Sequence, residues 1–142
     1  MGQINWGRVI GGGLLAGLIM NIGEAALHGG MLGQDGVELF RRYGVSDVAA
    51  PWQMIALIGM TFVLGVVAVW LYAAIRPRYG AGPGTAICAG LAVWVLAHVW
   101  SGVYLGAGFT GLIPPKLAWL PVAWGLVEAP LATLAGAWLY KE

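Results

Sequence analysis

The apolar positions of the chain form four long runs, and polar positions separate them. The runs cover residues 9–31, 53–75, 85–109 and 117–140. An α-helix needs about 20 mainly apolar residues to cross about 30 Å of hydrocarbon, and every run reaches that length. Strands of a membrane barrel would instead alternate apolar and polar residues over roughly ten positions. The pattern therefore predicts an all-α, polytopic membrane protein, in which residues 1–142 form a single domain with four transmembrane helices in one bundle.

The segments between the runs carry the helix breakers and most of the charge. Their sequences are GQDGVELFRRYGVSDVAAPW, RPRYGAGPG and TGLIPPK, and Gly and Pro interrupt helical backbone. In the first loop, residues 32–52, Val37, Phe40 and Tyr43 recur at three-residue spacing with charged residues between them. This spacing is typical of a short helix that lies in the membrane interface, although a plain polar loop fits the same residues.

The composition excludes several classes of protein. Hydrophobic residues make up 60% of the chain and charged residues only 9%, with a mean hydropathy of +0.81. Soluble domains carry roughly 25% charged residues, so this chain would expose large apolar patches in water and is expected to contact a lipid bilayer. The net charge of +1 offers no basic patch for nucleic acid. The single cysteine, Cys88, excludes a disulfide framework and any enzyme that needs a cysteine pair.

Lysine and arginine near the ends of the runs indicate the orientation. With the N-terminus inside, the cytoplasmic set is Arg8, Arg76, Arg78 and Lys141, and the outer set is Arg41, Arg42 and Lys116. The inner set is larger, and its RPR loop is the shorter one, so the positive-inside rule favours both termini in the cytoplasm. The first run is long, and Glu24 interrupts it where cleavage would occur, so we expect a retained helix and not a signal peptide.

The first run contains polar residues on one face. At 100° per residue, Asn21, Glu24 and His28 share an arc of about 80° with Gly13 and Gly17. The two glycines form a small-xxx-small motif, which lets a neighbouring helix approach closely. A second such motif is formed by Gly102 and Gly106, at GVYLG in the third run. The polar face of the first run is therefore expected to contact protein and not lipid.

An ionised glutamate that faces hydrocarbon costs a few kcal/mol or more, so Glu24 needs a partner, a proton or water. The third run supplies His98 and Ser101, and the fourth supplies Glu128. Counting 1.5 Å per residue places Glu24 and His98 at about the same depth, with Glu128 near the middle of its helix. The predicted buried polar cluster comprises Asn21, Glu24, His28, His98, Ser101 and Glu128, with His28 nearest the outer mouth.

Three kinds of function fit this cluster; the sequence favours the first, and the other two are alternatives. We predict no catalytic residue and no required cofactor. The first is an accessory or structural subunit, in which the cluster holds the helices in register within a homo-oligomer or a larger membrane assembly. The second is a small proton- or cation-coupled transporter or channel that uses the embedded glutamates and histidine. The third is a protein that binds a metal ion or haem. Its candidate metal ligands are Glu24, His28, His98 and Glu128.

A loose resemblance covers nearly the whole chain. The segments that carry it are MNIGE, YAAIRPRYGAGPGTA, AGLAVWVLAHVW and EAPLATLAGAWLYKE. With them, the sequence resembles a group of short bacterial four-helix membrane proteins that have no assigned activity. The resemblance implies a bacterial inner membrane location and the same number of helices, and it implies nothing about chemistry.

Overall fold

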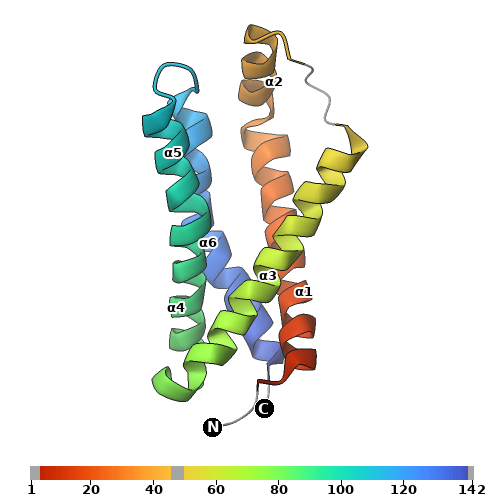
Figure 1. The fold of residues 1–142 in the computed structure, drawn as a ribbon, viewed down its shortest axis with the longest axis vertical. Helices are drawn as coiled ribbons and strands as arrows, with labels where there is room; N and C mark the ends of the chain where they lie inside the picture. Colours follow the sequence, from red (N-terminus) through yellow and green to blue (C-terminus); the bar gives the residue numbers. More distant parts are fainter. Residues whose placement is uncertain (1–3, 46–49, 141–142) are drawn as a thin grey trace.

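The computed structural model describes residues 4–45 and 50–140, which are helical over most of their length. Within these residues, four helical spans are long and apolar enough to cross a membrane: Trp6–Met31, Pro51–Tyr79, Pro83–Gly108 and Pro115–Leu139. They pack together in one bundle (Figure 1), and the start of the first span lies at the same end of the molecule as the end of the fourth span. The predicted fold class, an all-α bundle of four transmembrane helices, is confirmed.

Each span begins and ends close to the predicted limits, and two of them change their helical geometry partway. The first span comprises α1 (Trp6–Ala25) and the π-helical segment η1 (Ala26–Met31), and the second is α3 (Pro51–Tyr79). The third comprises α4 (Pro83–Trp94), the π-helical segment η2 (Val95–Val99) and α5 (Trp100–Gly108), and the fourth is α6 (Pro115–Leu139). The last three spans start at a proline, whose fixed φ suits the first helical position. The apolar pattern did not predict the π-helical segments.

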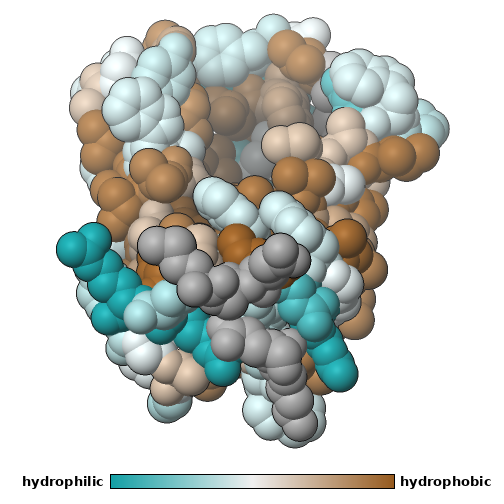
Figure 2. All heavy atoms as spheres, turned by 60° about the horizontal axis from the view of Figure 1, so that its bottom comes forward, coloured by the Kyte–Doolittle hydropathy of each residue, from teal (hydrophilic) through white to brown (hydrophobic). Residues whose placement is uncertain are grey.

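Small residues allow the helices to approach closely in the core. Gly13 and Gly17 of α1 lie against Val66 and Phe62 of α3, while Gly65 of α3 lies in turn against the α1 backbone. A Cβ added at Gly65 would lie 2.5 Å from the Gly13 carbonyl oxygen, so this position has no room for a side chain. Many of the larger apolar side chains point outward along the spans, and Figure 2 shows hydrophobic groups along the sides of the molecule.

The first loop contains a short helix, α2 (Gly33–Arg42), which continues beyond the end of η1 in Figure 1. At this end of the molecule α1 and α3 diverge from α5 and the first half of α6 (Figure 1). Two contacts link α2 and the residue after it to the opposite side. The Lys116 ammonium donates to the Asp35 carboxylate at 2.6 Å, and the Tyr43 hydroxyl donates to the Leu112 carbonyl at 3.0 Å. Whether α2 lies in a membrane interface stays a prediction.

Candidate functional site

The polar residues of the first span lie where α1 passes into η1. Glu24 occupies the last turn of α1, and His28 follows one turn later in η1. The His28 Nδ1 atom lies 2.9 Å from one carboxylate oxygen of Glu24 and 3.2 Å from the Glu24 carbonyl oxygen. A protonated Nδ1 can donate to both acceptors, so His28 folds back onto Glu24.

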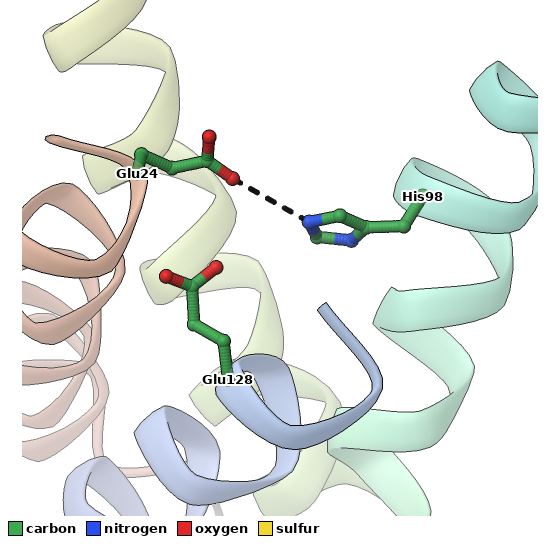
Figure 3. Close-up of side chains that lie close together, drawn as sticks. All are labelled: Glu24, His98 and Glu128. Atoms are coloured by element: carbon green, nitrogen blue, oxygen red, sulfur yellow. Dashed lines mark ion pairs between the residues drawn. The ribbon is translucent and has the colours of Figure 1, made fainter. Parts of the chain in front are cut away.

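His98 approaches the other oxygen of the same carboxylate from the third span. Its Nε2 atom lies 3.6 Å from Glu24 Oε1, an ion-pair contact that Figure 3 marks with a dashed line. The histidine belongs to η2, so both histidines of the chain occupy π-helical segments. Such segments are rare and are frequently found at functional sites. The periodicity of apolar residues in the sequence did not reveal these segments.

Glu128 completes the group from α6. Figure 3 shows its carboxylate pointing towards Glu24 and His98, each on a different helix. The Trp124 indole N–H donates to Glu128 Oε1 at 3.2 Å from one turn earlier on α6. One ligand atom from each of Glu24, His98 and Glu128 can be chosen so that all three lie within 4.8 Å of one another. Three separate spans therefore bring two carboxylates and an imidazole to one point.

Two glycines provide the space for these side chains. A Cβ added at Gly125 of α6 would lie 2.5 Å from Cγ and 2.7 Å from Nε2 of the His98 ring. A Cβ added at Gly23 of α1 would overlap the Glu128 carboxylate. The imidazole and the carboxylate therefore occupy room that a side chain would fill at either position. Sequence reasoning did not assign Gly23 or Gly125 to the site.

Exposure rises along the cluster from Glu128 towards His28. Glu128 is 8% exposed, and the side chains of His98 and Glu24 are 11% and 31% exposed. The His28 side chain is 58% exposed. The His98 Nδ1 atom is buried and has no hydrogen-bond partner within residues 4–45 and 50–140. The cluster thus extends from a buried centre to an accessible histidine, and it leaves one buried polar atom unsatisfied.

Asn21 and Ser101, which the sequence grouped with the cluster, bond elsewhere. The Asn21 amide donates to the Gly17 carbonyl at 2.8 Å and, at 3.5 Å, to the Ile58 carbonyl of α3. The Ser101 hydroxyl donates to the Ala97 carbonyl at 2.7 Å. Short polar side chains in a helix readily bond the carbonyl one turn earlier, and both residues do so. Of the six predicted residues, the structure thus brings together the two glutamates and the two histidines.

The remaining predicted packing residues lie inside the bundle. Gly102 lies against Val122 of α6, and Gly106 lies against Trp119 of the same helix. The faces around these glycines thus pack within the chain itself.

The fold and the site define a four-span α-helical membrane protein with a cluster of carboxylates and imidazoles at membrane depth. Comparisons with protein-family models, with curated proteins and with solved structures found no match. Membership of the bacterial group that the sequence resembles therefore stays a prediction.

Proposed function

We propose that the protein binds a divalent transition metal ion of the zinc type inside the membrane, through Glu24, His98 and Glu128. The observation that carries the proposal is the meeting of ligand atoms from three spans within 4.8 Å of one another. Ligand atoms around tetrahedral zinc lie about 3.4 Å apart, given metal–ligand distances of about 2.0–2.2 Å. Side-chain movements of about an ångström would therefore close the site, and His28 is the nearest further ligand.

Charge balance supports a divalent ion. Two carboxylates in a low-dielectric interior are costly unless they are neutralised. A doubly charged cation held by two carboxylates and neutral imidazoles gives a site with no net charge. Imidazole nitrogen and carboxylate oxygen are also the donors that suit zinc and its neighbours among the transition metals. The donor set and the membrane setting thus favour the same class of ligand.

The local packing supports a binding role over a purely structural one. A network that serves only to align helices should satisfy its own polar atoms with short hydrogen bonds, whereas the His98 Nε2 atom makes only a 3.6 Å contact with Glu24. Small residues on two further faces pack within the chain, Gly102 against α6 and Gly136 against α1. Assembly with other subunits or with a second copy stays a prediction.

A metal ion fits this arrangement better than a haem does. Two histidines that ligate one haem lie on opposite sides of the porphyrin ring. Here His28 and His98 both contact the Glu24 carboxylate, which lies between them. A porphyrin would have to occupy the place of that carboxylate.

The location in a bacterial inner membrane, with cytoplasmic termini, is part of the same proposal. The cytoplasmic placement of the termini is supported by arginines at the end where α1 begins and α3 ends, namely Arg8, Arg76 and Arg78. Hydrophilic groups also gather around this end in Figure 2. Lys141, the fourth cation of the predicted inner set, lies outside the described residues.

The proposal can be tested by metal titration of the full chain in lipid nanodiscs. Protein stripped with a chelator is titrated with Zn²⁺ by calorimetry, and Co²⁺ is used in parallel because its visible spectrum reports the coordination geometry. We expect one tight site in the wild type and its loss in Glu24→Gln, His98→Gln and Glu128→Gln. Glu38→Gln is the matched control, since Glu38 is an exposed carboxylate on α2. Equal zinc affinities for Glu128→Gln and Glu38→Gln would overturn the proposal.

A further inference from the structure

A second feature of the molecule is an apolar groove between α1 and α6. Its volume is about 590 Å³, within the range of small-molecule sites. Its walls include Ile19 and Ile22 of α1 and Leu120 and Val127 of α6. Ile22 and Val127 are each more than half exposed. Large apolar side chains exposed within membrane spans face lipid, so the groove opens to the acyl chains and not to water.

One carboxyl side chain lies in the apolar wall of the groove. Glu128 and Trp124 line it together with the apolar side chains, and the Glu128 carboxylate packs against Gly23 of α1. The indole N–H of Trp124 binds one carboxylate oxygen, so the group is held at the groove wall by a residue of its own helix. Glu128 therefore belongs both to the polar cluster with Glu24 and His98 and to the wall of this groove.

We infer that the groove binds a lipophilic amine, with the ammonium group against the Glu128 carboxylate and the apolar body along α1 and α6. Charge complementarity selects this occupant, because a carboxylate in an apolar wall is stabilised by a cation. The Trp124 ring adds a π surface of the kind that attracts organic cations. A fatty acid would place a second negative charge beside Glu128.

The depth of Glu128 argues against a phospholipid headgroup as the cation. Glu128 lies 13 residues after Pro115, the start of the span, which corresponds to about 20 Å along the helix at 1.5 Å per residue. A headgroup stays at the membrane surface, whereas a single ammonium on a long apolar body can reach the interior. A phospholipid acyl chain could fill the groove, but its binding would not depend on the carboxylate. The effect of a Glu128 substitution on binding therefore distinguishes a lipophilic amine from a phospholipid.

This inference goes beyond metal binding but shares Glu128 with it, so the two ligands should compete. The test uses the full chain in nanodiscs, with decylamine as the probe and decanol and decanoate as matched probes of equal chain length. Heats from protein-free nanodiscs are subtracted to remove partition into lipid. We expect saturable binding of decylamine but not of decanol or decanoate. Glu128→Gln should weaken decylamine binding by tenfold or more, which corresponds to about 1.4 kcal/mol or more of binding free energy. Glutamine retains an acceptor for Trp124, which keeps the local packing.

A second variant tests the groove itself. Ala123→Phe places a ring in the groove from an exposed position on α6, and it should abolish decylamine binding while zinc binding persists. Equal binding of decylamine and decanol, or unchanged decylamine binding in Glu128→Gln, would overturn the inference. A wild type that binds decylamine but not zinc would instead overturn only the proposed function.

Discussion

The His98 imidazole lies directly against the backbone of Gly125, where a Cβ would come within 2.7 Å of Nε2. The ring position that faces Glu24 thus depends on a residue with no side chain on a different helix. The amino acid sequence contains both residues, but no periodic pattern relates them. The room that Gly125 leaves beside the ring therefore helps to determine where the His98 imidazole lies.

The first prediction follows from this contact. Gly125→Ala should displace the His98 ring and weaken zinc binding by roughly 10–100-fold, the usual cost of disturbing the groups that orient a metal ligand. Zinc titration in nanodiscs measures the change. Gly59→Ala is the control, because a Cβ there meets no atom within 4 Å. If Gly125→Ala bound zinc as tightly as Gly59→Ala, zinc binding would not depend on the present position of the His98 ring.

The second prediction concerns the two histidines. His98 is largely buried and is contributed by a different span from Glu24, whereas the side chain of His28 is more than half exposed. Loss of His98 should therefore abolish tight zinc binding, and His28→Gln should reduce the affinity by a smaller factor. Parallel calorimetric titrations of the two variants give the comparison. A larger loss in His28→Gln would place the metal at the outer mouth and contradict the order proposed here.

The third prediction concerns the orientation of Glu128. Trp124→Phe keeps an aromatic ring but removes the N–H that donates to the carboxylate at 3.2 Å. Residues that hold a ligand in place contribute about 10–100-fold to metal affinity, so zinc binding should fall within that range. Trp119→Phe is a suitable control, since Trp119 lies on the same helix and contacts Gly106 instead. Equal affinities in the two variants would show that Glu128 needs no such donor.

Much of the fold could be predicted from the sequence because membrane helices leave a direct signal. Four apolar runs of sufficient length gave the number and approximate limits of the spans. The rise per residue also gave Glu24 and His98 a common depth, and these side chains lie 3.6 Å apart. Depth along a helix can be counted from the sequence alone, since it depends only on the helical rise.

The details of the site depend on rotation and local geometry, which the sequence reveals less directly. Asn21 shares the helical face of Glu24, yet its amide bonds the Gly17 carbonyl of its own helix. The roles of Gly23 and Gly125 depend on the side chains opposite them, on helices distant in the sequence. The π-helical segments around His28 and His98 depart from the 3.6-residue period, so the apolar pattern does not reveal them. Each of these features required the three-dimensional arrangement.

The fourth prediction tests the packing of α1 against α3. A methyl group at Gly65 would lie 2.5 Å from the Gly13 carbonyl oxygen and 2.7 Å from the Gly17 Cα atom. Both neighbours are backbone atoms, so the helices must separate to accept it. Overpacking of this kind typically costs about 1–3 kcal/mol. Gly65→Ala should therefore lower the free energy of unfolding by about that amount, measured by detergent-induced unfolding of the purified protein.

Gly59→Ala again supplies the comparison, because both glycines lie on α3 and differ in what surrounds them. Alanine has the higher helix propensity by about 1 kcal/mol in water, so Gly59→Ala should leave stability unchanged or raise it. The opposite signs expected for two identical substitutions on one helix make the test specific for the α1–α3 contact. If both variants were equally stable, the two helices would have to pack less closely than the contact of Gly65 with Gly13 implies.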